Sequence, residues 1–168
     1  MFKNFIKHNL LAFIMLTVLF LLDRFSKFFI LKLLEQDTKL DYYLNSYLNL
    51  YLIWNKGIAF GLLSFDQIKI YNIITALILI IIFIILVFIV RSKGLTKYSL
   101  VAVLAGALGN VFDRIYYSAV PDFIDFHIGE FHWFIFNIAD IFISLGVFCL
   151  IYVELFINKE IKENEKNY

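Results

Sequence analysis

The stretch WFIFNIADIFISLGVFCLIYV, residues 133–153, is long enough and apolar enough to cross a membrane as a helix. Its single charged side chain is Asp140. A carboxylate inside a bilayer costs at least about 2.5–3.5 kcal/mol on insertion scales, so such a group is normally kept for function. A second acid, Asp122, lies a short distance upstream. The two suggest a pair of carboxylates that carries the chemistry of the protein.

The composition is that of a membrane protein. Of the 168 residues, 62% are hydrophobic and 17% are charged, and the mean hydropathy is +0.82. A soluble domain has about 45–50% apolar and about 25% charged residues, so the excess apolar surface must face lipid. The net charge of +1 gives no electrostatic reason to expect nucleic-acid binding. The single cysteine, Cys149, excludes an intramolecular disulfide, and we expect it to be an inert thiol.

The hydrophobic pattern predicts an all-α polytopic membrane protein with four transmembrane helices in one domain, residues 1–168. The first segment has no small-residue cleavage site after Leu22, so we interpret it as a retained span rather than a cleaved signal peptide. The segment 70–90 carries no charge and is the clearest span. The predicted spans cover about residues 9–31, 70–90, 98–115 and 133–157.

The distribution of lysine and arginine predicts the orientation, because these residues concentrate in cytoplasmic connections. The connection 116–132 has neither, and the connection 33–67 has two lysines against four acids. Both connections are therefore expected on the periplasmic side, with both termini and a tail, 158–168, in the cytoplasm. The cytoplasmic positive residues are Lys3, Lys7, Arg91, Lys93, Lys97, Lys159, Lys162 and Lys166.

The first periplasmic connection has the pattern of short strands. Leu48, Leu50 and Leu52 alternate with other residues within the tyrosine-rich stretch 42–54, which is typical of strands with one apolar face. We expect a small β-sheet cradle on or near the outer membrane surface.

Polar residues recur at helical spacing in three of the predicted spans. Asn110 is followed by Asp113 and Arg114, and Asn137 by Asp140, which places each set on one helix face. Polar groups at bilayer depth turn toward one another, so these faces could converge on one cleft. Structural roles are also open: Asp23 and Lys27 form an i,i+4 ion pair, Asp113 with Arg114 could end a helix or bind a lipid head group, and Asn110 and Asn137 could join helices.

Two carboxylates remain as the reactive groups. Two acids that share a site come to hold one proton between them, so one can activate a water while the other donates a proton. Asp122 and Asp140 could therefore hydrolyse an amide without a covalent intermediate. Asp125 is interpreted as a solvated loop acid. The spacing of His127 and His132 is unlike that of a metal-binding motif, so no metal is expected.

Five sequence blocks together resemble the lipoprotein signal peptidases, the type II signal peptidases of bacteria. Any one block is a weak signal, but five in the right order on a chain of this length are strong. The resemblance covers nearly the whole chain. The blocks are DRFSK at 23–27, NKGIAF at 55–60, GALGN at 106–110 followed by Asp113 and Arg114, VPDF at 120–123, and FNIAD at 136–140.

The resemblance implies an aspartyl endopeptidase of the bacterial inner membrane, which cuts the signal peptide from a prolipoprotein just before its diacylglyceryl-modified cysteine. Asp122 and Asp140 match the catalytic aspartates, and the assignment of base and acid stays open. It implies no cofactor, and we expect a monomer that meets substrate and lipid within the membrane. Positions that line or support the cleft are Asn55, Gly57, Asn110, Arg114 and Asn137; structural motif positions are Asp23, Lys27, Ala59, Phe60 and Asp113.

The chain departs from the family pattern at a few positions. Pro121 stands where a small aliphatic residue usually precedes the first catalytic aspartate, and proline fixes φ and removes an N–H donor. No departure removes a chemical group that the mechanism needs. Two other functions compete with the peptidase: an ion-coupled transporter, for which the sequence offers no inverted repeat, and a non-catalytic scaffold whose polar faces only join helices.

Overall fold

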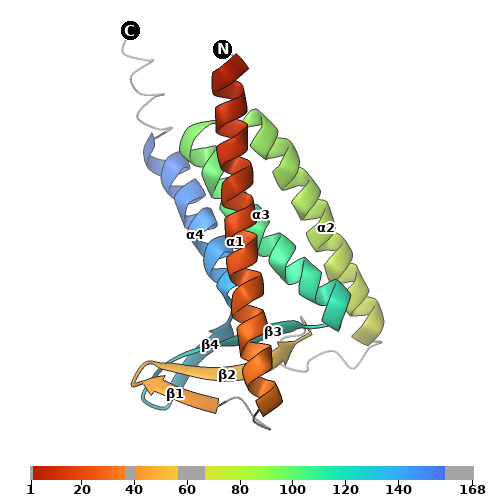
Figure 1. Cartoon of the computed structure of the whole chain (residues 1–168), viewed down its shortest axis with the longest axis vertical. Coiled ribbons are helices and arrows are strands. Elements are labelled where there is room, and N and C mark those ends of the chain that lie inside the picture. Colours follow the sequence, from red (N-terminus) through yellow and green to blue (C-terminus); the bar gives the residue numbers. More distant parts are fainter. Residues whose placement is uncertain (1, 37–40, 57–66, 158–168) are drawn as a thin grey trace.

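In the computed structural model, which describes residues 2–36, 41–56 and 67–157, a helical bundle carries a small sheet at one end (Figure 1). The helices are α1 (Phe2–Gln36), α2 (Gln67–Arg91), α3 (Gly94–Tyr117) and α4 (Ile138–Tyr152), and α4 continues as a π-helical turn, η2 (Val153–Ile157). The strands are β1 (Asp41–Asn45), β2 (Leu48–Asn55), β3 (Val120–Ile128) and β4 (Phe131–Phe136).

Three helical segments in the described part of the chain are long and apolar enough to cross a membrane: Tyr71–Arg91, Gly94–Tyr117 and Ile138–Ile157. The protein is therefore a multi-pass membrane protein. The first predicted span, which lies within α1, is not among the three, so a fourth crossing stays a prediction. The predicted tail, 158–168, lies outside the described residues.

Helix α3 is the centre of the bundle. Half of its most apolar window is buried, compared with 11% for the spans formed by α2 and α4, and α3 packs against α1, α2 and α4. Between α2 and α3, the apolar core includes Ile82, Ile85 and Leu104. The outer helices leave large apolar side chains such as Phe148 exposed, as expected for a surface that contacts lipid.

Helices α3 and α4 approach closely because α3 carries glycines at the contact. A Cβ atom on Gly106 would lie 2.3 Å from the backbone oxygen of Ala139 in α4. A Cβ atom on Gly109 would lie 2.5 Å from Asp23 Oδ2 in α1. Neither position accepts a larger residue without moving a neighbouring helix, so these two glycines set the separation of three helices.

The fourth predicted span began at Trp133, and this boundary is wrong. Residues Phe131–Phe136 form β4, and α4 begins only at Ile138. A continuous apolar run cannot distinguish a strand from a helix by periodicity, and the aromatic residues here favour a strand. Asn137 separates the two elements: its backbone is extended, with φ −126° and ψ 179°, and its side chain caps α4.

The predicted small sheet is present and is larger than expected. Its four strands are antiparallel in the order β1-β2-β3-β4, so the connection 116–132 contributes β3 to the same sheet as the stretch 42–54. Asp122 lies on β3, where it pairs with Ile53 of β2, and not in a loop. Asp125 was expected to be solvated, but it also lies on β3 and is only 3% exposed. The sheet therefore delivers one of the two predicted catalytic acids.

Candidate active site

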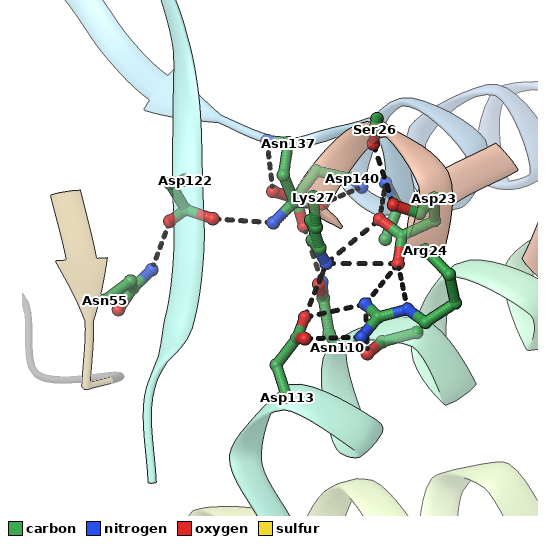
Figure 2. A network of polar contacts seen from close by, with 12 residues as sticks. Asp23, Arg24, Ser26, Lys27, Asn55, Asn110, Asp113, Asp122, Asn137 and Asp140 are labelled. Atoms are coloured by element: carbon green, nitrogen blue, oxygen red, sulfur yellow. Dashed lines mark hydrogen bonds and ion pairs between the residues drawn. The ribbon is translucent and has the colours of Figure 1, made fainter. Parts of the chain in front are cut away.

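The Asp122 carboxylate is held between two asparagine amides. Asn55 Nδ2, at the end of β2, donates to Asp122 Oδ2 at 2.9 Å. Asn137 Nδ2, from the residue before α4, donates to Asp122 Oδ1 at 2.6 Å. The side chain is 4% exposed. Two separate elements thus fix both oxygens of a buried acid, as Figure 2 shows.

The Asp140 carboxylate lies in the first turn of α4. Its Oδ2 accepts from the Asn137 backbone N–H at 3.1 Å, and its own N–H donates to Asn137 Oδ1 at 3.2 Å. These reciprocal bonds form a capping box. Asn110 Nδ2 of α3 donates to Asp140 Oδ1 at 2.8 Å. The two donors fix both oxygens of the Asp140 side chain at the start of α4.

Asn137 connects the two acids. Its amide nitrogen binds Asp122, while its amide oxygen and its backbone N–H bind Asp140. Asn137 itself is fully buried. The structure therefore brings Asp122 and Asp140 to opposite sides of a single amide side chain.

Behind Asp140 lies a buried cluster of charges that joins α1 to α3. Lys27 Nζ donates to Asn110 Oδ1 at 2.9 Å and to Asp113 Oδ2 at 2.6 Å, and it lies 2.9 Å from Asp23 Oδ1. Lys27 is 2% exposed, and the two aspartates are fully buried. Charges taken out of water at this depth require partners. The cluster thereby fixes Asn110, which in turn holds Asp140.

Arg24 completes the cluster, a role that was not predicted from the sequence. Its guanidinium donates to Asp113 through Nη1 at 2.5 Å and Nη2 at 2.8 Å, and to the Gly109 carbonyl at 2.9 Å. It also pairs with Asp23. Two cations then balance two anions. The signal in the sequence was the position of Arg24 beside Asp23, one turn before Lys27, at the end of an apolar run.

Helix α1 also reaches α4 directly. Asp23 Oδ1 accepts from the backbone N–H of Ala139 at 3.0 Å. The N–H groups of the first helical turn have no partner within the helix. A side chain of α1 therefore satisfies one of these donors, next to Asp140.

The electrostatic surroundings of the two acids differ. Burial raises the pKa of the Asp122 carboxyl above its ordinary value. The hydrogen bonds from Asn55 and Asn137 lower this pKa, the negative charge of Asp140 raises it, and the positive charge of Lys27 lowers it. Burial is the largest of these effects, so Asp122 keeps a proton to higher pH than an exposed aspartate does.

Not every predicted site residue joins this network. Arg114 lies on α3 with its guanidinium 5.6 Å from the centre of the Tyr71 ring, and its backbone oxygen accepts from the Tyr71 hydroxyl at 2.8 Å. Within the described part of the chain, Arg114 Nε and Nη1 are buried without a hydrogen-bond partner. Gly57, Ala59 and Phe60 lie outside the described residues.

A cavity of about 460 Å³ adjoins the strand that carries Asn55. Trp54 precedes Asn55 on β2 and pairs with Pro121, the residue before Asp122. The cavity therefore adjoins the residue before Asn55 on β2, while Asp122 is not among the residues that line it. Its lining comes from α1, β2 and the end of α3, and consists of Phe28, Leu31, Lys32, Glu35, Trp54 and Tyr117.

Comparison with known proteins places this arrangement in a sequence family. Residues 15–156 match the family described as signal peptidase (SPase) II. A lipoprotein signal peptidase of Pelagibacter ubique (strain HTCC1062) is 52% identical over 162 residues, covering 96% of this chain and 97% of that protein. One from Francisella tularensis subsp. novicida (strain U112) is 37% identical over 163 residues, covering 94% and 99%.

Solved structures agree with the fold. A structure described as a bacterial membrane enzyme at 1.9 Å resolution superposes with a TM-score of 0.71 and 28% identity, covering 86% of this chain and 92% of that one. A second, at 2.3 Å resolution, gives a TM-score of 0.65 and 27% identity, covering 90% of each chain.

Proposed function

The chain belongs to the signal peptidase II family, the lipoprotein signal peptidases, and we propose that it is an intramembrane aspartyl endopeptidase. Its substrate is a diacylglyceryl-modified prolipoprotein, and it cuts just before the modified cysteine. The observation that carries the proposal is that the one residue Asn137 donates to both carboxylates, through its side-chain Nδ2 to Asp122 and through its backbone N–H to Asp140. A pair of acids held this close supplies a base and an acid to one reaction.

The reaction needs only water and one shared proton. Asp140 removes a proton from a water, and the water oxygen forms a bond to the scissile carbonyl carbon. Asp122 gives its proton to the carbonyl oxygen, which yields a gem-diol. Asp140 then gives the proton that it took from water to the nitrogen, while Asp122 takes back a proton from one hydroxyl of the gem-diol, so the C–N bond breaks, a carboxyl group forms and the new amino-terminal cysteine leaves. Both aspartates act as one coupled pair throughout.

The surroundings of the acids support this division of roles. Asp140 accepts hydrogen bonds from Asn110 and from the Asn137 backbone, and we assign it the role of the base. The pKa of Asp122 is raised by burial, which favours the protonated form needed for an acid. Asn55, Asn110 and Asn137 position the two groups.

The arrangement in the membrane supports access from one side. We place the sheet and the acid pair at the periplasmic face of the inner membrane and both termini in the cytoplasm, with α1 as the fourth span. The signal helix of the substrate enters between helices, and its acyl chains stay in lipid. The enzyme acts as a monomer without a cofactor.

Replacing each acid by its amide tests the proposal. We expect Asp122→Asn and Asp140→Asn to lose nearly all turnover of a diacylated prolipoprotein in proteoliposomes, measured by the mobility shift of the cleaved product. Asp41→Asn is the control, because Asp41 is an exposed acid on the edge strand β1. Near-normal turnover by either active-site variant would instead favour a scaffold, and Asp140-dependent ion flux would favour a transporter.

A further inference from the structure

A second group of ionisable side chains lies on the sheet. Asp125 and His127 are two residues apart on β3, so they share one face of the sheet, whereas Asp122 is three residues from Asp125 and faces the other way. His132 lies directly opposite His127 in the register of β3 and β4. This group is therefore separate from the acid pair, although it shares a strand with it.

The three side chains converge on a small volume. His132 Nδ1 lies 2.8 Å from Asp125 Oδ2, and His127 Nδ1 lies 3.8 Å from the same oxygen. The two imidazole rings stack with their centres 5.1 Å apart. One nitrogen from each histidine and one oxygen of Asp125 all lie within 4.8 Å of one another.

Some buried polar atoms in and beside this group have no hydrogen-bond partner. Asp125 is 3% exposed and His127 is 7% exposed. Among the described residues, Asp125 Oδ1 and His127 Nδ1 are buried without a hydrogen-bond partner, and so is Asn49 Oδ1. Asn49 lies opposite Asp125 in the register of β2 and β3. A buried polar atom without a partner costs about 1–3 kcal/mol, so three at one place point to a bound group.

We propose that Asp125, His127 and His132 bind a first-row transition-metal ion, with Zn²⁺ as the best match. Two imidazoles and a carboxylate are a donor set that suits Zn²⁺. Tetrahedral ligands at about 2.0–2.1 Å from Zn²⁺ lie about 3.4 Å from one another. His132 Nδ1 now forms a hydrogen bond with Asp125 Oδ2 at 2.8 Å, His127 Nδ1 lies 3.8 Å from that oxygen, and no donor pair is more than 4.8 Å apart, so side-chain rotations are needed to surround an ion.

The register of the sheet also supplies a support for the fourth position. A water bound to the ion can donate a hydrogen bond to Asn49 Oδ1, which ties β2 to the site. The side chain of His132 is 53% exposed, which gives the ion a path from solvent. The ion then acts as a clasp across β2, β3 and β4, on the face of β3 opposite Asp122. This proposal differs from the expectation from sequence spacing that the two histidines bind no metal.

Metal titration of the purified protein tests the site. The full chain, without a polyhistidine tag and stripped with a chelator, is titrated in detergent micelles with ZnCl2 by calorimetry and with Co²⁺ by visible absorbance. We expect one ion per chain and a tetrahedral Co²⁺ spectrum. His127→Gln, His132→Gln and Asp125→Asn should each weaken binding by about tenfold or more.

Matched variants and a stability measurement make the outcome clear. His8→Gln changes the remaining histidine of the sequence, and Glu130→Gln changes an exposed acid at the β3–β4 turn; both should bind Zn²⁺ like the parent chain. Zn²⁺ should raise the melting temperature of the parent chain and not that of His127→Gln.

The proposal is overturned if the parent chain shows no saturable binding, or if folded His127→Gln and His132→Gln bind as it does. The group is then an ion pair only. None of these readouts uses peptide cleavage, so failure here leaves the proposed peptidase function standing.

Discussion

At the scale of single residues, Asn137 has the most tasks. Its amide oxygen caps α4 through the Asp140 N–H, its amide nitrogen binds Asp122, and its backbone N–H binds Asp140. Aspartate at this position would cap the helix as well, but it offers no N–H donor to Asp122. Only an amide side chain of this length both caps α4 and donates to Asp122, so the residue that starts α4 also positions a proposed catalytic acid.

Substituting Asn137 by serine separates these tasks. Serine is also a good helix cap, so the start of α4 keeps its cap, and we expect only the moderate fall in melting temperature that follows from leaving the buried Asp122 Oδ1 without a donor, which costs about 1–3 kcal/mol. The hydrogen bond to Asp122 is lost, and misplaced reacting groups can cost about 100-fold in rate. Turnover in proteoliposomes and thermal unfolding in detergent measure the two effects. Equal turnover with equal stability would exclude a positioning role for the amide nitrogen.

The hydrogen bond from Asn55 predicts a change in pH dependence. This bond lowers the pKa of Asp122 against the larger effect of burial, so Asn55→Ala should raise that pKa further. Asp122 must hold a proton to act as the acid, so activity falls as the pH rises through its pKa. The alkaline limb of kcat/KM should therefore move to higher pH in Asn55→Ala and stay in place in Asp41→Asn.

The same raised pKa has a consequence for stability. The folded chain binds the Asp122 proton more tightly than the unfolded chain, so ionisation of Asp122 opposes folding. Its contribution to stability is complete below the ordinary pKa and is lost as the pH rises through the raised one. Asp122→Asn should remove this loss, so its melting temperature relative to the parent chain should increase with pH.

At the scale of elements, the contact between α1 and α3 depends on buried charge. Lys27 touches Asp23 and Asp113, and both aspartates are fully buried. Removing one partner of a buried ion pair leaves an uncompensated charge and costs about 3–5 kcal/mol. The exposed Lys32 lies farther along the same helix and serves as the matched control.

We therefore expect Lys27→Met to lower the melting temperature strongly and Lys32→Met to leave it unchanged. Lys27→Met combined with Asp113→Asn removes one charge of each sign and should recover part of the loss. Thermal unfolding of the three variants in one detergent checks this. A melting temperature for Lys27→Met like that of the parent chain would mean that the cluster does not stabilise the bundle.

The elements themselves differ in how far the sequence could predict them. The long uncharged run in α2 and the small residues of α3 indicate helices directly. Asp122 and Asp140 could be recognised because acids near a membrane span are rare. The strand β4 could not be predicted in this way. Its residues FHWFIF are as apolar as the helix that follows, and only the pairing with β3 decides their conformation.

Contacts that depend on strand register or on helix packing were harder to predict from the sequence. Asp125, His127 and His132 are close in sequence, but they meet only because strand register sets them side by side, and sequence spacing does not reveal register. Arg24 of α1 donates to Asp113 of α3, which lies 89 positions away in the sequence. Such pairings follow from how the helices pack, which local pattern does not encode.

At the scale of the whole molecule, the sheet and the α2–α3 connection lie at opposite ends of the bundle (Figure 1). The start of α1 and the end of α4 lie at the same end as that connection. With lysines and arginines concentrated there, the arrangement predicts which end faces the cytoplasm.

Cysteine labelling tests this orientation. In a Cys149→Ala background, Glu130→Cys places a thiol at the exposed β3–β4 turn, and Lys93→Cys places one between α2 and α3. A membrane-impermeant maleimide should label position 130 in intact spheroplasts, and position 93 only after the membrane is permeabilised. The reverse pattern would place the acid pair on the cytoplasmic side and contradict the proposed access for substrate.

The bond from the Ala139 N–H to Asp23 spans 116 positions of the chain. During synthesis, α1 leaves the ribosome long before α4, so Asp23 cannot form its bond with the Ala139 N–H until the last helix has inserted. Shorter nascent chains lack Asp140 altogether and leave the acids of α1 and α3 without their final neighbour. The proposed peptidase therefore cannot act before its last helix is in place.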